Sequence, residues 1–399
     1  MTRAVRLLAI AAAITLLAGT GSATAATKPT NVPTPPDRHD VVLIGNSAAG
    51  TVSLLDGHTF ANLGTFNAIP DLRQRLDEMD LVERAAYEVI RLQKGGDRFV
   101  DDVAVAPDGR TLFVSRSNLA DFVAFDLVTG AQLWRFEVDG HHADHIAISP
   151  DGSRLVISAT TAGRAHVLDT RTGAEVGNFA TGTYPHGNDY SHDGQRIYNA
   201  SIGVTSIPKA LEFLKGPRRL TVVDTRTLRT VRTYDFDHGI RPAVILPDET
   251  LMYAQLSYLN GFVEYDLTTG RILRTVNLPF SDAGRALHPD QYPQNSAHHG
   301  LAMSGDGSKL CSAGTINNYV AIVSRPALTT DRLVPSGELP YWATTSLDGA
   351  HCLVTNSKDD TVSVISYATA QEVKRVTVGD FPQRERLAAV TGAVLDALS

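Results

Sequence analysis

Residues 41–56 read VVLIGNSAAGTVSLLD, and residues 351–366 read HCLVTNSKDDTVSVIS. Each stretch predicts a strand, an Asn-Ser turn and a second strand in which apolar and polar residues alternate. One copy lies near the start of the chain and the other near its end, so the same unit spans almost the whole sequence. Such self-similarity indicates a repeat architecture.

A second motif, related to D-x-x-T-G, sets the length of the repeat. Five copies start at an Asp and two degenerate copies at a Ser: Asp56, Asp126, Asp169, Asp224, Asp266, Ser324 and Ser366. Three intervals between them are 42 or 43 residues long, and intervals of 55, 58 and 70 residues indicate insertions. Seven units of about 42 residues with four short strands each predict the blades of a β-propeller. A β-sandwich or two smaller β-domains would not need seven copies in register.

A third motif, an Asp-Gly hairpin turn, occurs once fewer than the blades. Its copies are centred on Asp108, Asp151, Asp193, Asp248, Asp306 and Asp348. Glycine suits such turns because it adopts positive φ without steric cost. Six copies for seven blades indicate that the N-terminal blade lacks its own inner strand. Residues 379–390 (GDFPQRERLAAV) are similar to the start of an inner strand, so we expect them to complete that blade and close the ring.

These patterns predict an all-β fold over residues 41–390, a seven-bladed β-propeller of four-stranded blades, with a C-terminal tail at 391–399. Two phrases carry a family resemblance: residues 185–194 read P-H-G-x-x-x-S-x-D-G, and residues 353–365 read L-V-T-N-S-x-x-x-T-V-S-V-I. Over about residues 40–390 the chain resembles the secreted bacterial YVTN-repeat proteins. The resemblance implies the fold and leaves the function open, because that family includes binding proteins, cofactor-bearing oxidoreductases, lyases and lactonases.

The N-terminus has the pattern of a Sec-type signal peptide over residues 1–25. Arg3 and Arg6 precede an apolar run at 7–18, and Ala23-Thr24-Ala25 is a cleavage signal. The run is too short for a mature transmembrane helix, so we expect a secreted, extracellular protein without stable membrane insertion rather than an anchored one. Residues 26–40 are rich in Pro and Thr and predict an extended tether.

The net charge limits the kinds of partner that we expect, and the cysteines bear on the compartment in which the protein folds. A net charge of −7 without a basic stripe excludes nucleic acid as the expected partner. Cys311 and Cys352 are the two cysteines, and they fall in strands of consecutive blades. An exported protein can bridge such a pair, although packed sheets usually lie about 10 Å apart, which is wide for a disulfide. Both outcomes stay open.

All three insertions, at 67–98, 203–218 and 281–297, fall in connections that share one face of the propeller. In the first, apolar residues recur at helical spacing from Leu72 to Val89, and Gly95-Gly96 is a stop signal. Pro208 and Gly216 bound a short helix in the second, and the third reads as irregular. We expect this decorated face to cap one mouth of the central channel and to contact a small-molecule ligand or a protein partner.

Inner strands start at the same mouth, and their first residues form a chemically distinctive set. The positions seven residues before each Asp-Gly turn are Asp101, Asp144, His186, Arg241, His299 and Tyr341. The positions that follow are Asp102, His145, Gly187, Pro242, Gly300 and Trp342, and His141, His142, His238 and His298 lie just upstream. Because strand residues alternate in direction, only part of this set is expected to face the channel.

Imidazoles and a carboxylate on converging strands predict a site for a divalent transition metal. The candidate ligands are His142, Asp144, His145, His186, His298 and His299, and the candidate catalytic groups are His186, His299, Arg241 and Tyr341. Arg241 would stabilise an oxyanion, and Tyr341 or a histidine not bound to metal would serve as acid or base. Asp101 and Asp102 are expected to be solvated rather than ligating. Equally, the histidines would only hydrogen-bond water in a wet channel, or belong to the repeat itself.

Three functions remain open. A metal-assisted lyase, lactonase or other hydrolase would use the His/Asp/Arg cluster on a small polar or anionic molecule. A non-catalytic binding or interaction propeller would use the decorated face. A redox protein would carry a bound cofactor, but covalently attached haem is excluded because the chain has no C-x-x-C-H motif.

Overall fold

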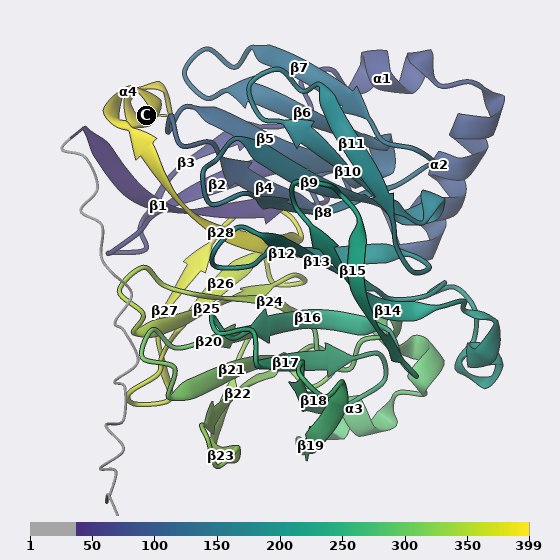
Figure 1. Ribbon diagram of the computed structural model, residues 1–399. Helices are drawn as coiled ribbons and strands as arrows, with labels where there is room; N and C mark the ends of the chain where they lie inside the picture. Colours follow the sequence, from purple (N-terminus) through teal and green to yellow (C-terminus); the bar gives the residue numbers. More distant parts are fainter. Residues whose placement is uncertain (1–36, 399) are drawn as a thin grey trace, which may run out of the picture.

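The computed structural model describes residues 37–398, in which 28 strands form seven four-stranded antiparallel sheets around a central channel (Figure 1). Blade 1 combines β28 (Pro382–Thr391) with β1 (Arg38–Asn46), β2 (Thr51–Asp56) and β3 (Asn62–Asn67). Blade 2 contains β4 (Asp102–Val105), β5 (Thr111–Arg116), β6 (Asp121–Asp126) and β7 (Gln132–Glu137). Blade 3 contains β8 (Ala143–Ile148), β9 (Arg154–Ala159), β10 (Arg164–Asp169) and β11 (Glu175–Ala180).

The remaining blades follow the same inner-to-outer order. Blade 4 contains β12 (Pro185–Tyr190), β13 (Arg196–Ser201), β14 (Arg218–Asp224) and β15 (Thr230–Phe236). Blade 5 contains β16 (Ile240–Ile245), β17 (Leu251–Leu256), β18 (Gly261–Asp266) and β19 (Arg271–Asn277). Blade 6 contains β20 (Leu301–Met303), β21 (Lys309–Gly314), β22 (Tyr319–Ser324) and β23 (Thr329–Pro335). Blade 7 contains β24 (Pro340–Thr345), β25 (His351–Asn356), β26 (Thr361–Ser366) and β27 (Gln371–Thr377).

The predicted fold and ring closure are both confirmed. The C-terminal strand β28 pairs antiparallel with β1, from Arg38 opposite Thr391 to Asn46 opposite Pro382, and forms the inner strand of blade 1. Apolar residues from facing sheets form the core between blades. For example, Val41 and Leu43 of blade 1 pack with Val114 and Val123 of blade 2. The core therefore holds the seven inner strands around one axis.

A disulfide joins Cys311 of β21 to Cys352 of β25, which settles the pairing that the sequence left open. Their Cα atoms are 6.4 Å apart, well inside the usual spacing between packed sheets. Small neighbours explain the close approach, because Ala313 and Ala343 line the same interface between blades 6 and 7. A disulfide is typical of proteins that fold in an oxidising compartment.

Short helices collect on one face, at the right of Figure 1, as the positions of the insertions predicted. The first insertion forms α1 (Leu72–Glu78) and α2 (Leu81–Gln93), because Asp80 caps α2 through the amides of Val82 and Glu83 and separates the two helices. The second forms the 3₁₀ helix η3 (Lys209–Leu214). The third forms α3 (Asp282–Ala286), η4 (Pro289–Gln291) and η5 (Pro293–Asn295).

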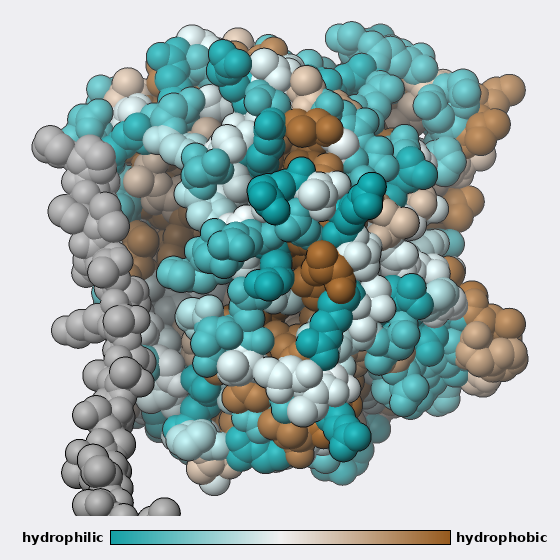
Figure 2. All heavy atoms as spheres, viewed as in Figure 1, coloured by the Kyte–Doolittle hydropathy of each residue, from teal (hydrophilic) through white to brown (hydrophobic). Residues whose placement is uncertain are grey.

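The apolar residues that recur at helical spacing in the first insertion are only partly buried. Leu72 and Leu76 pack against Phe99, whereas Val82 and Val89 of α2 are 67% and 52% exposed. Tyr87 is the buried residue of α2 and packs with Phe99, so this helix buries only part of its apolar surface. Hydrophobic spheres accordingly stand out at the right-hand edge of Figure 2, over the helical insertions.

The other end of the chain forms α4 (Gly392–Leu398), which packs beside β3, at the upper left of Figure 1. The predicted signal peptide and most of the tether lie outside the described residues. Within residues 37–398, no helix is both long and apolar enough to cross a membrane.

Candidate metal centre

One residue from each blade forms a buried ring at the mouth of the channel beneath the helices. The seven members are Asp101, Asp144, His186, Arg241, His299, Tyr341 and Gln383, and each is less than 9% exposed. Six of them are the positions expected from the spacing of the Asp-Gly turns. The seventh, Gln383, comes from the closing strand β28.

Local irregularities in the inner strands explain why neighbouring residues both reach the channel. The register of β8 with β9 shifts between Ala143 and Ile146, so Asp144 and His145 lie in a bulge. Similar shifts occur in β12 around His186 and in β16 around Arg241. A bulge re-aims side chains and interrupts the alternation of a regular strand. The strict alternation that limited the expected set therefore does not apply at the ring.

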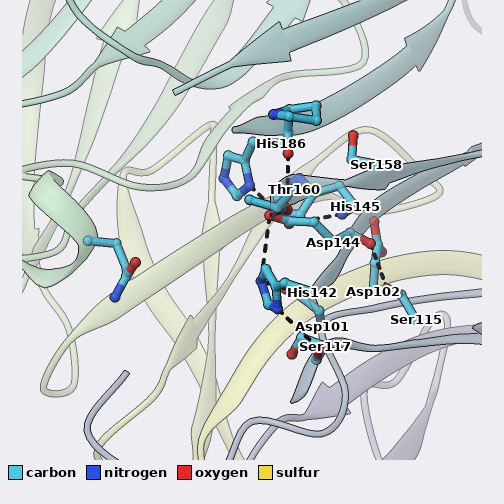
Figure 3. A network of polar contacts seen from close by, with 12 residues as sticks. Asp101, Asp102, Ser115, Ser117, His142, Asp144, His145, Ser158, Thr160 and His186 are labelled. Carbon is cyan, nitrogen blue, oxygen red and sulfur yellow. Dashed lines mark hydrogen bonds and ion pairs between the residues drawn. The ribbon is translucent and has the colours of Figure 1, made fainter. Parts of the chain in front are cut away.

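Asp144, His145 and His186 bring three potential ligand atoms together (Figure 3). Asp144 Oδ1 lies 3.0 Å from His186 Nδ1 and 3.4 Å from His145 Nε2. His145 Nε2 is buried without a hydrogen-bond partner, and the rings of His145 and His186 lie 3.8 Å apart. Two imidazoles and one carboxylate form a donor set that suits divalent transition metals.

His299 contacts His186 on the side away from Asp144. Its Nδ1 donates to the Tyr341 carbonyl at 2.9 Å, so its Nε2 accepts, and the nearest donor is His186 Nε2 at 3.3 Å. His186 Nδ1 lies 3.0 Å from the Asp144 carboxylate, so the single proton of a neutral His186 has an acceptor on either side of the ring. Burial lowers the pKa of His186 and holds that of His299 well below its usual value. A cation between His186 Nδ1 and Asp144 would satisfy both atoms without protonating the imidazole.

A second group of donors lies on the other side of Asp144. His142 Nε2 is 3.9 Å from both Asp101 Oδ2 and Asp144 Oδ2, while its Nδ1 donates to the Ser117 carbonyl at 3.1 Å. Lys94, directly after α2, donates to His142 Nε2 at 2.9 Å. Burial lowers the pKa of His142 to about 3, so it is a neutral acceptor.

Arg241 and Tyr341 complete the polar lining above this cluster. Arg241 donates from Nε to Ser257 at 3.1 Å and from Nη2 to the Gln294 carbonyl, which fixes the guanidinium under the third insertion. Burial lowers the pKa of Arg241 to about 10 and raises that of Tyr341 to about 12, so both keep their protons at neutral pH. The Tyr341 ring stacks on His299 with centroids 4.2 Å apart.

Two hollows meet at His186 and Arg241. The upper one, about 50 Å³, lies under α2 and includes Lys94 and Tyr341 in its lining. The lower one, about 310 Å³, runs down the channel and has Trp342 in its wall. A small molecule in the lower hollow would lie beside the ring.

Asp101 and Asp102 are buried, so the expectation that they are solvated is wrong. Asp102 forms an ion pair with Arg386 at 2.6 Å, and Arg384 lies 3.6 Å away. Burial, reinforced by the nearby carboxylate of Asp144, raises the pKa of Asp101 to about 7. The closing strand thus brings two arginines that compensate part of the negative charge in the channel.

The structure does not bring every candidate ligand together. His298 lies apart from His299: its Nδ1 contacts Ser312 Oγ at 3.0 Å, and its Nε2 lies 3.5 Å from the Tyr319 hydroxyl. His141 contacts Thr161 through its backbone, and His238 pairs with Glu212 of the second insertion at 2.7 Å.

Several residues of the site were not found from the sequence. Gln383 and Arg384 follow Pro382, which starts β28 just as Pro185 starts β12 and Pro340 starts β24. Each proline follows a residue with positive φ, namely Tyr184, Leu339 and Phe381. A proline at the start of the inner strand was therefore a sequence feature from which Gln383 and Arg384 could have been placed at the ring. Lys94 offered no such feature, because the sequence does not show where an inserted helix lies over the channel.

Comparisons with known proteins agree with the fold and do not name a reaction. A family model described as outer membrane protein assembly factor BamB matches residues 93–276, less than half of the chain. Among solved structures, Kuenenia stuttgartiensis hydrazine synthase is similar with a TM-score of 0.59 and 20% identity, over 82% of this chain and 92% of that chain. No curated protein matches the sequence.

The class of protein is therefore a seven-bladed β-propeller with repeats similar to those of BamB. The channel of this chain contains two buried His/Asp groups that could hold a metal ion. At this level of identity the likeness to hydrazine synthase concerns the fold alone.

Proposed function

We propose that this propeller is a metal-dependent enzyme of the lyase or lactonase/hydrolase type, with a divalent transition metal held by Asp144, His145 and His186. The observation that carries the proposal is the geometry of these three donors. Their atoms lie 3.0 and 3.4 Å from the shared carboxylate oxygen, as expected of ligands about 2.0–2.2 Å from one ion. His145 Nε2 is buried without a hydrogen-bond partner, and a cation at this position would supply one.

A metal ion at this position would acidify a bound water and polarise a substrate oxygen. The protein supplies the remaining parts. His299 orients His186 through its Nε2, in the way that outer-shell partners commonly orient metal ligands. Arg241 offers a fixed positive charge for a carboxylate or a developing oxyanion, and Tyr341 holds a proton for a leaving group.

The size and charge of the hollows support a small polar or anionic substrate. The lower hollow of about 310 Å³ is at the small end of ligand pockets. Arg241 lines both hollows, and Lys94 lines the upper one. Hydrolysis or elimination fits such a site because each needs an activated base and a stabilised anion.

We also infer that the protein is secreted and that its repeats are of the YVTN type. The sequence pattern of residues 1–25 supports export through a Sec-type signal, and the disulfide between Cys311 and Cys352 suits an oxidising compartment. The phrases at 185–194 and 353–365 support the repeat type.

Metal content and activity of the purified mature protein test the enzyme proposal together. We expect elemental analysis to find tightly bound zinc, iron, copper or a similar ion, and His145→Ala and His186→Ala to lose it. His298→Ala is the matched control, because His298 is equally buried but lies outside the cluster. We expect the wild-type protein to turn over members of a panel of lactones and elimination substrates, and to lose this activity when a chelator removes the metal. Metal-free wild-type protein that cannot be reloaded would refute the proposal.

A second candidate is a non-catalytic interaction propeller that binds a protein partner at the decorated face. Exposed apolar side chains on that face favour it, with Leu81 of α2 at 90% and Phe213 of η3 at 76% exposure. The matching family model is described as an assembly factor, which agrees with a binding role. Capture of a partner that is lost in Leu81→Ser and Phe213→Ser, together with no bound metal, would favour this function over the enzyme.

A further inference from the structure

His142 and Asp101 have no part in the proposed reaction, yet together with Asp144 they form a second group of candidate metal ligands. Asp101, His142 and Asp144 are each at least 96% buried, and all their candidate ligand atoms lie within 4.8 Å of one another. The Ser117 carbonyl accepts from His142 Nδ1, so Nε2 carries the lone pair; it faces the two carboxylates and accepts from Lys94. Figure 3 shows His142 and Asp101 on one side of Asp144 and His186 on the other.

Asp144 connects this group to the first site through its two oxygens. Oδ1 faces His145 and His186, whereas Oδ2 faces His142 and accepts from Thr160 at 3.0 Å. A carboxylate shared in this way can bridge two ions, and two-metal hydrolytic sites commonly hold their ions about 3.5–4 Å apart. The carboxylate is therefore placed to serve two cations at once.

The group of Asp101, His142 and Asp144 already has a positive charge beside it, the Lys94 ammonium. This contact is the independent observation that the group attracts a cation. The Lys94 ammonium lies 2.9 Å from His142 Nε2. A metal ion bound to His142 would use the same nitrogen. Lys94 immediately precedes Gly95 and Gly96, whose φ values of 72° and 139° are open to few other residues. Its side chain also lines an outer groove of about 880 Å³ beside the upper hollow, so the ammonium has space to swing outward.

We propose that Asp101, His142 and Asp144 form a second divalent-metal site, bridged by Asp144 to the first, and that Lys94 competes with the metal for it. With Lys94 inward, the protein holds one ion and a tethered ammonium. With Lys94 outward, it holds two ions that clamp the attacking and leaving oxygens of the substrate. This inference rests on the proposed function for its first ion, but its test is separable.

Metal stoichiometry of Lys94→Met tests the competition. Mn²⁺ titration followed by electron paramagnetic resonance counts bound ions and shows exchange coupling when two ions share a bridge. We expect Lys94→Met to bind the second ion at least about tenfold more tightly than wild type, because a hydrogen bond from a charged donor no longer opposes it. Lys358→Met removes a charge from the same face, beside Glu338 and away from the cluster, and should behave as wild type.

Removal of His142 identifies the site that gains the ion. The double variant Lys94→Met/His142→Ala should return to one ion without exchange coupling, while Lys94→Met/His145→Ala should lose the first ion. If Lys94→Met binds a single ion as wild type does, the second site is refuted and the first stands. If neither protein binds any ion, both proposals fail. Thermal melting of each variant separates loss of a ligand from loss of the fold, and rescue of the count by His142→Asp would support direct ligation.

Discussion

Glu385 is an acidic residue buried in the seam that closes the ring. It lies in the closing strand β28 opposite Ile44, its side chain is fully buried, and neither carboxylate oxygen has a hydrogen-bond partner. Burial raises its pKa well above the usual value. We predict that Glu385→Leu stabilises the protein, because an unsatisfied buried polar group costs about 1–3 kcal/mol. For a propeller of this size the melting temperature should rise by about 1–4 °C.

The pH dependence of this gain follows from the raised pKa. Below about pH 4 the carboxyl is protonated in both folded and unfolded chains, so its ionisation contributes nothing. Above that pH the unfolded chain ionises while the folded chain keeps the proton. The wild type then loses about 1.4 kcal/mol of stability per pH unit until the pH passes the raised pKa. The advantage of the variant should therefore grow from pH 5 to pH 8.

Thermal melts of wild type, Glu385→Leu and Glu385→Gln at pH 5 and pH 8 check this reasoning. Glu385→Gln keeps a buried polar group but cannot ionise, so its gain should come almost entirely at the higher pH. Equal gains at both pH values, or destabilisation by both variants at pH 8, would show that the carboxyl has a partner or is ionised in the folded state.

Three further perturbations test other contacts. Cys311→Ser should lower the free energy of unfolding by about 4 kcal/mol, since the bridge to Cys352 closes a loop with a sequence separation of 41, and reductant should reproduce the loss in wild type alone. Arg241→Met should weaken acetate binding to the metal-loaded protein at least about tenfold by calorimetry while the metal content stays unchanged; a loss of metal would contradict an anion-binding role. Trp342→Leu should cost about 2 kcal/mol or more in chemical denaturation, because the Arg384 guanidinium lies 3.5 Å from the ring and would lose its contact; an unchanged midpoint would exclude that contribution.

The blades could be predicted because their motifs recur along the sequence at a regular interval. Ring closure could be predicted because six Asp-Gly turns left the first blade without an inner strand. The spacing of Asp-Gly turns also located the ring from Asp101 to Tyr341, since equivalent positions in equivalent strands end at one mouth. Alternation alone could not tell that His145 joins Asp144 in the channel, because the bulge in β8 depends on pairing with β9. Lys94 could not be placed either, since its position depends on how α2 packs over the channel.

Burial of Asp101 and Asp102 also escaped prediction, for an electrostatic reason. A pair of adjacent acids at a strand start normally favours solvent. Here Arg384 and Arg386 approach from β28, and Arg386 is 284 residues away from Asp102 in sequence. Only closure of the ring brings these opposite charges together, so the local pattern carried no information about them.

Pairing of the first and last strands also has a consequence for the order of folding. The inner strand of blade 1 is the last of the 28 described strands to be synthesised, so a growing chain cannot complete its ring until nearly all of the propeller is available. Contacts between the two ends close the longest possible loop and form slowly for entropic reasons. A polypeptide that must cross a narrow translocation pore before folding would benefit from this delay, because the strands before β28 cannot close the ring by themselves.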